Sequence, residues 1–217
     1  AAEAGLDIGG FRLAATPHSH AAAGQAVVMA GHGEVEALMK GSLHTDELMH
    51  AVGADNARST WRRSSHCYLF DVAVYPRPLF ITDAAINIFP SLSDKHDICQ
   101  NAIDFAVAMG VCLPKVAILS AVELVTEKMP ATIDAAALCK MAERGQITGG
   151  VLDGPLAFDN AISMEAARIK NIISPVAGQA DILLVPDIES GNMLAKQLTF
   201  FEGGDGAGIQ VGAKLPI

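Results

Sequence analysis

The chain has 217 residues, of which 51% are apolar and only 5% aromatic, and this balance favours an α/β protein in which alanine-rich helices cover aliphatic strands. The net charge of −9 argues against a general role in nucleic-acid binding, which needs a basic face. No apolar run approaches the roughly 20 residues that cross a bilayer, and the N-terminus has no signal-peptide pattern, so we expect a cytoplasmic protein.

The first third of the chain predicts short elements of both kinds. They are a strand over residues 11–15, a helix over 20–30 and a strand-like piece over 36–39. Gly41 and Ser42 then interrupt the strand, and Thr45 or Asp46 can cap a helix that continues through residue 49. Because the chain opens in mid-helix without a capping residue, we expect a further portion of the protein to precede it.

The remaining two thirds predict a regular alternation of strands and helices. Strands over 67–72 and 79–82, joined by the turn YPRP, predict an antiparallel hairpin or adjacent strands. The later elements are a helix over 95–109, a strand over 116–120, helices over 134–144 and 160–172, a strand over 181–187, a helix over 190–201 and a glycine-rich tail. Strands separated by helices of roughly 10–15 residues predict βαβ units and a mostly parallel sheet.

Polar residues gather where the predicted strands end, which is where open α/β sheets bind ligands. Ser120, Asp153 and Asp187 each end a predicted strand, and Asp159 opens the next helix. Together with Glu189, the three aspartates could collect into a divalent metal site. Ordinary turn and cap roles fit the same residues, so both interpretations stay open.

The segment LMKGSLHTDEL resembles an anion site in its chemistry. Free backbone N–H groups are expected after Gly41 and Ser42, Lys40 and His44 can add charge, and Thr45 can add a directional hydroxyl. An ordinary strand-to-helix loop without a ligand has the same pattern. In the segment ITDAAINIFPSL, Asp83 and Asn87 flank small alanines, which allow a ligand to approach, although Asp83 can equally be a helix cap.

A basic cluster, RSTWRRSSH, runs from Arg58 to His66 with three arginines and no acid. One local basic cluster in an acidic protein indicates a focused site for a small anion, while a solvated charged turn is the alternative. The four cysteines form no CxxC pair, so we expect reduced, mostly buried thiols. No GxSxG or Walker A motif occurs, and GGDGAG lacks the context of a dinucleotide fingerprint.

Six segments in this order and spacing resemble the phosphate acetyl/butyryltransferase family from about residue 5 to residue 217. They are LMKGSLHTDELM, ITDAAINI, VAILSAVE, VLDGPLAFDNAIS, PDIESGNMLAKQL and GGDGAGIQVGAKLPI. The resemblance is closest to the butyryltransferase-like branch, including its form fused behind an enoyl-CoA hydratase-like domain. The family's acetyltransferase branch often has a cysteine at the position of Ala84, so no thiol role is expected here.

The resemblance implies a two-domain, three-layer α/β/α fold with mostly parallel sheets, related to isocitrate and isopropylmalate dehydrogenases. We expect residues 1–70 in a first domain, 71–208 in a second, and 209–217 to return to the first. The active site is expected in the interdomain cleft of a homodimer.

The implied reaction converts acyl-CoA and phosphate to acyl phosphate and CoA, without a covalent acyl-enzyme. Coenzyme A is then a substrate, and neither a metal nor a permanently bound cofactor is expected. Nor do we expect nucleic-acid or membrane partners. Whether the acyl group is acetyl or butyryl stays open, since one methylene changes binding by only about 1–3 kcal/mol.

The resemblance and the residue patterns together give a list of expected site residues. Phosphate and substrate binding is expected at Lys40, Gly41, Ser42, His44, Thr45, Arg58, Arg62, Asp83 and Asn87, and the cleft is expected to be lined by Ser120, Asp153, Asp159, Asp187 and Asn192. Which of the two arginines faces phosphate is open. The family's catalytic serine, arginine and aspartate belong to a stretch beyond the position of Ile217, so we expect the base and a catalytic arginine there.

Two alternative functions remain at this stage. One is a non-catalytic homologue that binds CoA or acyl phosphate. The other is a metal-dependent decarboxylating dehydrogenase of related fold, which would need Mg²⁺ and NAD.

Overall fold

The computed structural model describes residues 5, 7, 9–54, 62–201, 203–213 and 216–217. The chain divides into two compact units, Ala1–Ser59 and Thr60–Ile217. The domain boundaries expected near residues 70 and 208 stay predictions, although β1 (Ser65–Asp71) and β6 (Asp205–Val211) both belong to the sheet of the second unit. Among the described residues, no helix has both the length and the apolar character needed to cross a membrane.

The described part of the first unit consists of two helices and irregular segments. Helix α1 (Ser19–Gly31) begins where His18 Nδ1 accepts the backbone N–H of Ala21 at 3.2 Å, and α2 (Thr45–Ala54) follows the Gly41-Ser42 loop. The strands predicted over 11–15 and 36–39 are wrong, because both segments are irregular. No described segment of this unit provides a partner strand for them, and an unpaired strand leaves its backbone groups without partners.

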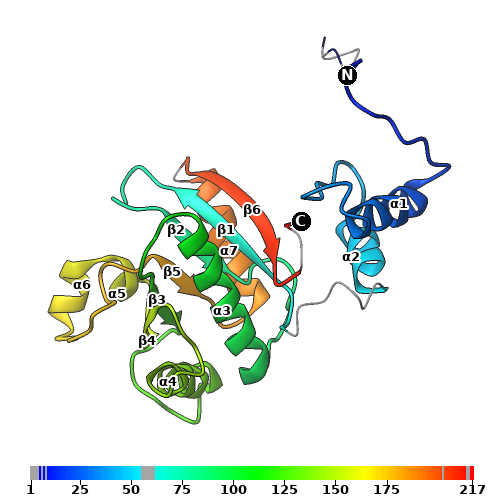
Figure 1. Cartoon of the computed structure of the whole chain (residues 1–217). Helices are drawn as coiled ribbons and strands as arrows, with labels where there is room; N and C mark the ends of the chain where they lie inside the picture. The colour runs from blue at the N-terminus through cyan, green and yellow to red at the C-terminus, as the bar shows by residue number, and fades with distance from the viewer. Residues whose placement is uncertain (1–4, 6, 8, 55–61, 202, 214–215) are drawn as a thin grey trace. The chain divides into compact units, whose positions relative to one another are not determined.

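The second unit contains one six-stranded sheet in the order β4-β3-β5-β2-β1-β6 (Figure 1). Its remaining strands are β2 (Leu79–Thr82), β3 (Lys115–Leu119), β4 (Val151–Leu156) and β5 (Ile182–Leu184). The four strands from β4 to β2 are parallel, whereas β1 pairs antiparallel with β2 on one side and with β6 on the other. The predicted antiparallel hairpin and the mostly parallel sheet are therefore confirmed.

The sequence reasoning missed strand β6, which it took for a glycine-rich tail. The glycines are what permit this strand to form. A Cβ at Gly206 would lie within 2.8 Å of the Phe70 ring, and one at Gly208 would lie 2.6 Å from His66 Nε2. Large side chains of β1 therefore lie across β6, and only glycine leaves room for them.

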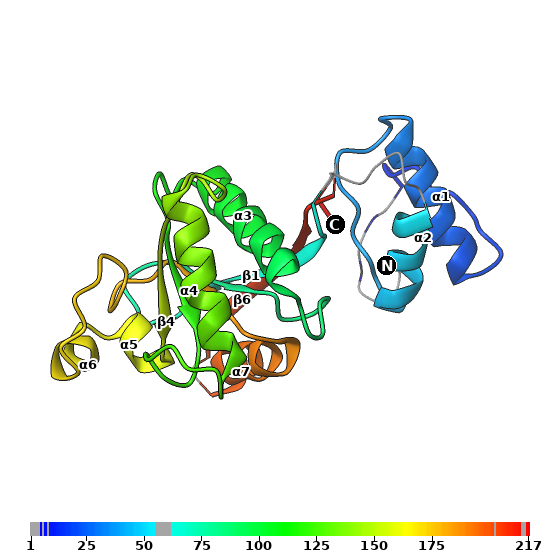
Figure 2. The same cartoon turned by 90° about the horizontal axis from the view of Figure 1, so that it is seen from below.

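Helices cover both faces of the sheet and give three layers. Helices α3 (Leu92–Ala108) and α4 (Pro130–Glu143) lie on one face, and α7 (Ile188–Phe200) lies on the other (Figures 1 and 2). Alternate strand residues feed the two apolar cores, as when Ile81 packs on the α7 side and Phe80 on the α3 side. The expected α/β/α layering is thus present in this unit.

Three local expectations need correction. The helix predicted over 160–172 is divided into α5 (Phe158–Ile162) and α6 (Met164–Ile169), because Ser163 has extended backbone and caps α6. Asp153 lies inside β4 rather than at its end. The expectation of mostly buried thiols holds for Cys67 and Cys99 but is wrong for Cys112, which is exposed.

Candidate functional site

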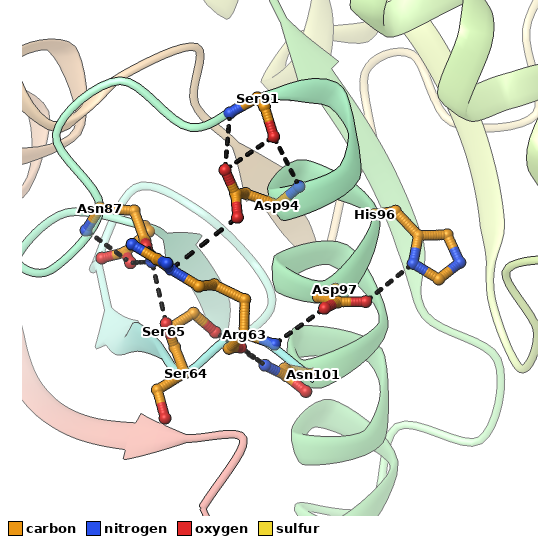
Figure 3. Close-up of polar contacts among 10 residues, drawn as sticks. Arg63, Ser64, Ser65, Asn87, Ser91, Asp94, His96, Asp97 and Asn101 are labelled. Carbon is orange, nitrogen blue, oxygen red and sulfur yellow. Dashed lines mark hydrogen bonds and ion pairs between the residues drawn. The ribbon is translucent and has the colours of Figure 1, made fainter. Parts of the chain in front are cut away.

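The antiparallel register of β1 and β2 brings two predicted site segments together. Cys67 lies opposite Thr82, so the residues that precede β1 meet the residues that follow β2. Helix α3 begins shortly afterwards and adds its first turns to the same place (Figure 3). The result is a polar cluster at the carboxyl end of β2, where ligands bind in sheets of this kind.

Asp83 organises the turn that follows β2. The residue is 3% exposed, and its Oδ1 accepts the N–H groups of Ala85 at 2.9 Å and Ile86 at 3.0 Å. Its Oδ2 accepts the backbone N–H of Asn87 at 3.1 Å and Asn87 Nδ2 at 2.5 Å. Four donors therefore satisfy this buried carboxylate, as a buried charge requires.

Asn87 connects this turn to the segment before β1. Its buried amide Nδ2 also donates to the carbonyl of Ser64 at 2.9 Å, and its Oδ1 accepts Arg63 Nε at 2.7 Å. The hydrogen-bond partners fix which end of the amide is oxygen, because Asp83 and the Ser64 carbonyl can only accept. The side chain is therefore held in one orientation.

Arg63 extends from the cluster with its terminal nitrogens open. Its Nε bonds Asn87, as Figure 3 shows, and lies 3.8 Å from Asp94 Oδ1. Within the described part of the chain, its two Nη atoms make no hydrogen bond. A guanidinium fixed at Nε leaves its planar Nη pair free for a bidentate contact with an anion, and little side-chain entropy remains to be lost on binding.

Helix α3 holds the backbone of Arg63 in place. Asp97 Oδ2 accepts the Arg63 backbone N–H at 2.8 Å, and Asn101 Nδ2 donates to the Arg63 carbonyl at 2.8 Å. His96 Nδ1 in turn lies 2.9 Å from the other Asp97 oxygen. The position of the arginine is thus set on both sides, by the turn after β2 and by α3.

Among the described carboxylates, Asp94 is the one that forms an ion pair with the Arg63 side chain. It closes a capping box with Ser91 at the start of α3. The hydrogen bond from the Ser91 hydroxyl and that from its backbone N–H lower the pKa of Asp94 below its ordinary value, and Arg63 lowers it further. At neutral pH Asp94 is therefore ionised, and it compensates part of the Arg63 charge at a distance too long for a hydrogen bond.

Of the two arginines expected from the sequence to bind phosphate, the structure describes one, and it lies elsewhere. Arg62 points to the flank of α3, where its Nη1 is 2.5 Å from Asp104 Oδ2. Arg58 lies outside the described residues. Sequence reasoning missed Arg63, although the pair of adjacent arginines was a visible signal.

His66 is the second residue of β1, next to this cluster. Its Nδ1 is buried and has no hydrogen-bond partner in the described structure. Burial lowers the pKa of His66 from its ordinary value of 6.5, and the nearby charge of Asp83 offsets only part of that change. Its ring packs edge-on against Tyr68 with 4.4 Å between the ring centroids.

The predicted segment over residues 40–45 lies in the first unit, beside a cavity of about 510 Å³ between α1 and α2. Lys40, Gly41, Ser42 and His44 all line this cavity. The Lys40 ammonium folds back on its own loop, with Nζ 3.1 Å from the Leu43 carbonyl. Thr45 begins α2, but its side chain lies outside what the structure describes.

The residues expected along the cleft have local roles in the second unit. Asp187 caps α7, accepting the N–H of Ser190 at 2.9 Å, and Asn192 Nδ2 donates to the carbonyl of Ala84 at 3.2 Å beside the Asp83 turn. Asp153 Oδ1 accepts the N–H of its neighbour Gly154. The described residues contain no group of three or more histidine, cysteine or carboxylate side chains able to hold a metal ion.

Two more of these residues complete the set. Ser120, directly after β3, donates its hydroxyl toward the sulfur of Met129 at 3.1 Å. Asp159 lies 4.0 Å from the ammonium of Lys170, which also pairs with Glu123 at 2.8 Å.

The family model for phosphate acetyl/butaryl transferase matches residues 11–217 of the chain. The chain belongs to this family. Its relatives include a phosphate acetyltransferase from Rhizobium meliloti, 64% identical over all of this chain and 69% of the relative's length. A phosphate acetyltransferase from Rickettsia prowazekii is 57% identical and a phosphate butyryltransferase from Clostridium acetobutylicum is 42% identical, each over 98% of this chain. The chain spans 61% of the former's length and 71% of the latter's.

The solved structures agree with the family assignment. A branched-chain phosphotransacylase from Enterococcus faecalis matches 97% of this chain and 76% of its own length, with a TM-score of 0.87 at 31% identity. A 4-hydroxythreonine-4-phosphate dehydrogenase from Salmonella typhimurium matches with a TM-score of 0.55 at 15% identity, which shows a shared fold alone. The chain is therefore a phosphate acetyl/butyryltransferase-type enzyme in family and fold.

Proposed function

We propose that the protein transfers an acetyl group between coenzyme A and inorganic phosphate. Similarity to phosphate acetyltransferases along nearly all of this chain carries this proposal, and the acetyltransferases named above are more similar to the chain than the butyryltransferase is. The expected homodimer and the cytoplasmic location stay predictions.

Within this function, the polar cluster at the end of β2 binds the phosphate group. The open Nη pair of Arg63 supports this assignment, as does the bond from Asn87 that fixes its Nε. Arg62 is less suited to the role because Asp104 already occupies its guanidinium. A preorganised arginine stabilises the charge that develops on departing phosphate without having to reorganise during the reaction.

The reaction itself is an acyl transfer from a phosphate oxygen to the sulfur of CoA. The thiolate sulfur of CoA forms a bond to the acetyl carbonyl carbon, the bond from that carbon to the phosphate oxygen breaks, and phosphate leaves with the electron pair. The thiol proton goes to a base. The described residues of the polar cluster contribute binding and charge stabilisation to this step.

The test is phosphate-dependent release of CoA from acetyl-CoA and from butyryl-CoA by the full-length gene product. Turnover of acetyl-CoA with a higher kcat/KM than butyryl-CoA is expected. Absence of turnover with both substrates would refute the proposal, and CoA binding without turnover would instead support a non-catalytic homologue.

A pair of variants tests the phosphate site. Arg63→Ala should raise the KM for phosphate by about 10–100-fold, because hydrogen bonds to charged groups contribute about 1.5–3 kcal/mol. Arg62→Ala is the matched control, with the same charge change on the neighbouring residue, and should change that KM by less than about threefold. The reverse ranking would assign the phosphate to Arg62, one of the two arginines that the sequence alone offered.

A further inference from the structure

A cavity of about 710 Å³ lies in the second unit, at the opposite end of β2 from the polar cluster. Its lining comes from the loop between β1 and β2, from α5 and the start of α6, from the segment before β5 and from the second half of α7. Small-molecule sites typically have volumes of roughly 300–1,000 Å³. None of the described residues that line the cavity belongs to the polar cluster, so it is a separate site.

The lining of this cavity is mostly apolar and includes both buried and exposed side chains. Val72, Leu79 and Leu198 are buried and belong to the core on the α7 side of the sheet. Val74 and Met164 are 81% and 60% exposed. An aliphatic chain that contacts these side chains removes apolar surface from water, and the gain grows with the area covered.

Two hydrogen bonds hold the loop between β1 and β2 against the segment before β5. The Tyr75 hydroxyl donates to the Ala180 carbonyl at 2.6 Å, and Arg77 Nη1 donates to the Gln179 carbonyl at 3.1 Å. Tyr75, Arg77 and Gln179 all line the cavity. Because these contacts form without a ligand, a ligand loses little affinity to loop ordering.

Arg77 is the one charged residue among the described residues that line the cavity. Its Nη1 also donates to Asp181 Oδ1 at 3.0 Å, and the other Asp181 oxygen accepts the backbone N–H of Lys115 at 2.8 Å. Within the described part of the chain, Nε and Nη2 of Arg77 make no hydrogen bond. These two atoms form the side edge of the guanidinium, which can hold a second carboxylate in a bidentate contact. The cavity therefore fits an anion that carries an apolar chain.

We propose that this cavity binds an aliphatic carboxylate of medium chain length, with the carboxylate on the open edge of Arg77 and the chain against Leu79, Leu198 and Met164. Inorganic phosphate is less suited to the cavity, because it has no chain to cover the apolar lining. The proposal does not depend on the proposed function, since the cavity and the polar cluster lie at opposite ends of β2.

Calorimetric titration of the full-length protein with octanoate and decanoate tests the proposal. Decanoate should bind about tenfold more tightly than octanoate, because each buried methylene contributes a factor of roughly three to four. The alcohol 1-octanol has the same chain without the charge and should bind at least about tenfold more weakly than octanoate. Saturating phosphate should leave the Kd for decanoate unchanged.

Arg77→Met should weaken decanoate binding by about tenfold or more. Arg144→Met removes an exposed arginine of the same unit, and as the control it should leave the Kd within about twofold. Because Arg77→Met also takes a partner from Asp181, Val74→Glu is a second variant at an exposed position of the lining. Its negative charge should weaken decanoate binding by about fivefold, whereas the neutral Val74→Gln should have a smaller effect.

A wild-type protein that does not bind decanoate would overturn the proposal, and so would a Kd that both Arg77→Met and Val74→Glu leave unchanged. Competition between phosphate and decanoate would also reject it, because decanoate would then occupy the polar cluster. Sedimentation tests the other possible occupant, a second copy of the chain. If Met164→Asp separates a dimer into monomers and the wild type binds no decanoate, the apolar lining is a contact between copies and the proposal is wrong.

Discussion

Replacing Asn87 with alanine tests how much the hydrogen bonds of the polar cluster contribute to the free energy of unfolding. The substitution removes three hydrogen bonds made by the side chain of a residue that is 3% exposed. Two of them are donated by Nδ2, to the Ser64 carbonyl at 2.9 Å and to Asp83 at 2.5 Å, and the third is accepted by Oδ1 from Arg63.

The size of the effect follows from what each former partner can do instead. The Ser64 carbonyl loses the Asn87 bond in a partly buried position, which costs about 1–2 kcal/mol. Asp83 keeps its three backbone N–H donors, so the loss there is near the lower limit of about 1 kcal/mol. Arg63 is more than half exposed, and water can replace its Nε bond at little cost. We therefore expect the free energy of unfolding to fall by about 2–3 kcal/mol.

Urea denaturation of the full-length protein measures this loss, with the phosphate KM as a second readout. Asn192→Ala is the matched control, because that side chain makes a single bond, 3.2 Å to the Ala84 carbonyl, and should cost about 1 kcal/mol. A loss for Asn87→Ala no larger than that for Asn192→Ala would refute the argument. In the functional assay, freeing Nε should raise the KM for phosphate, but less than Arg63→Ala does.

Three further substitutions test other parts of the second unit. Asp134→Asn should cost about 3 kcal/mol in a thermal melt, because it leaves the buried ammonium of Lys95 without its carboxylate at 2.7 Å; a loss below about 1 kcal/mol would contradict this. Gly178→Ala should lower the free energy of unfolding by at least about 2 kcal/mol, because Gly178 has φ +77° and a Cβ would lie 2.6 Å from Met164 Cα. The control is Gly24→Ala in α1, which has open space around it and should be neutral or stabilising. His66→Gln concerns pH. Because burial lowers the pKa of His66 below 6.5 in the folded state, the unfolded chain binds the proton first and stability falls as the pH drops below about 6.5. Unfolding midpoints measured between pH 7 and pH 5 should therefore decline less steeply in His66→Gln than in the wild type, and parallel curves would contradict the cause given.

The central sheet was predictable because its strands are marked locally. The run over residues 116–119 is aliphatic and buried, and it is bounded by polar residues and turns. The hairpin of β1 and β2 was equally visible, since two strand-like runs flank a proline turn. Where a strand is buried on both faces, its own sequence carries the signal.

Elements that depend on a distant partner were not predictable in this way. Residues 11–15 and 36–39 have strand-like composition, yet both are irregular. Strand β6 has the opposite character, because DGAGIQV has little strand propensity and forms only against the free edge of β1. The side chains that leave room only for glycine in this strand, Phe70 and His66, are well over a hundred residues away in the chain. Tertiary contact, not local preference, decides these segments.

The candidate site shows the same limit at the scale of one residue. Arg62 and Arg63 are neighbours of identical chemistry, so charge alone cannot say which of them is available to an anion. The structure distinguishes the two arginines through their backbone. Asp97 accepts the backbone N–H of Arg63, and Asn101 donates to its carbonyl. Because the backbone is fixed there, the two side chains have different partners. Among the described residues, Arg62 is neutralised by Asp104, whereas the Arg63 side chain makes its one hydrogen bond through Nε. Of the two arginines of the basic cluster that the structure describes, Arg63 is therefore the one available to an anion, and Asn87 orients it.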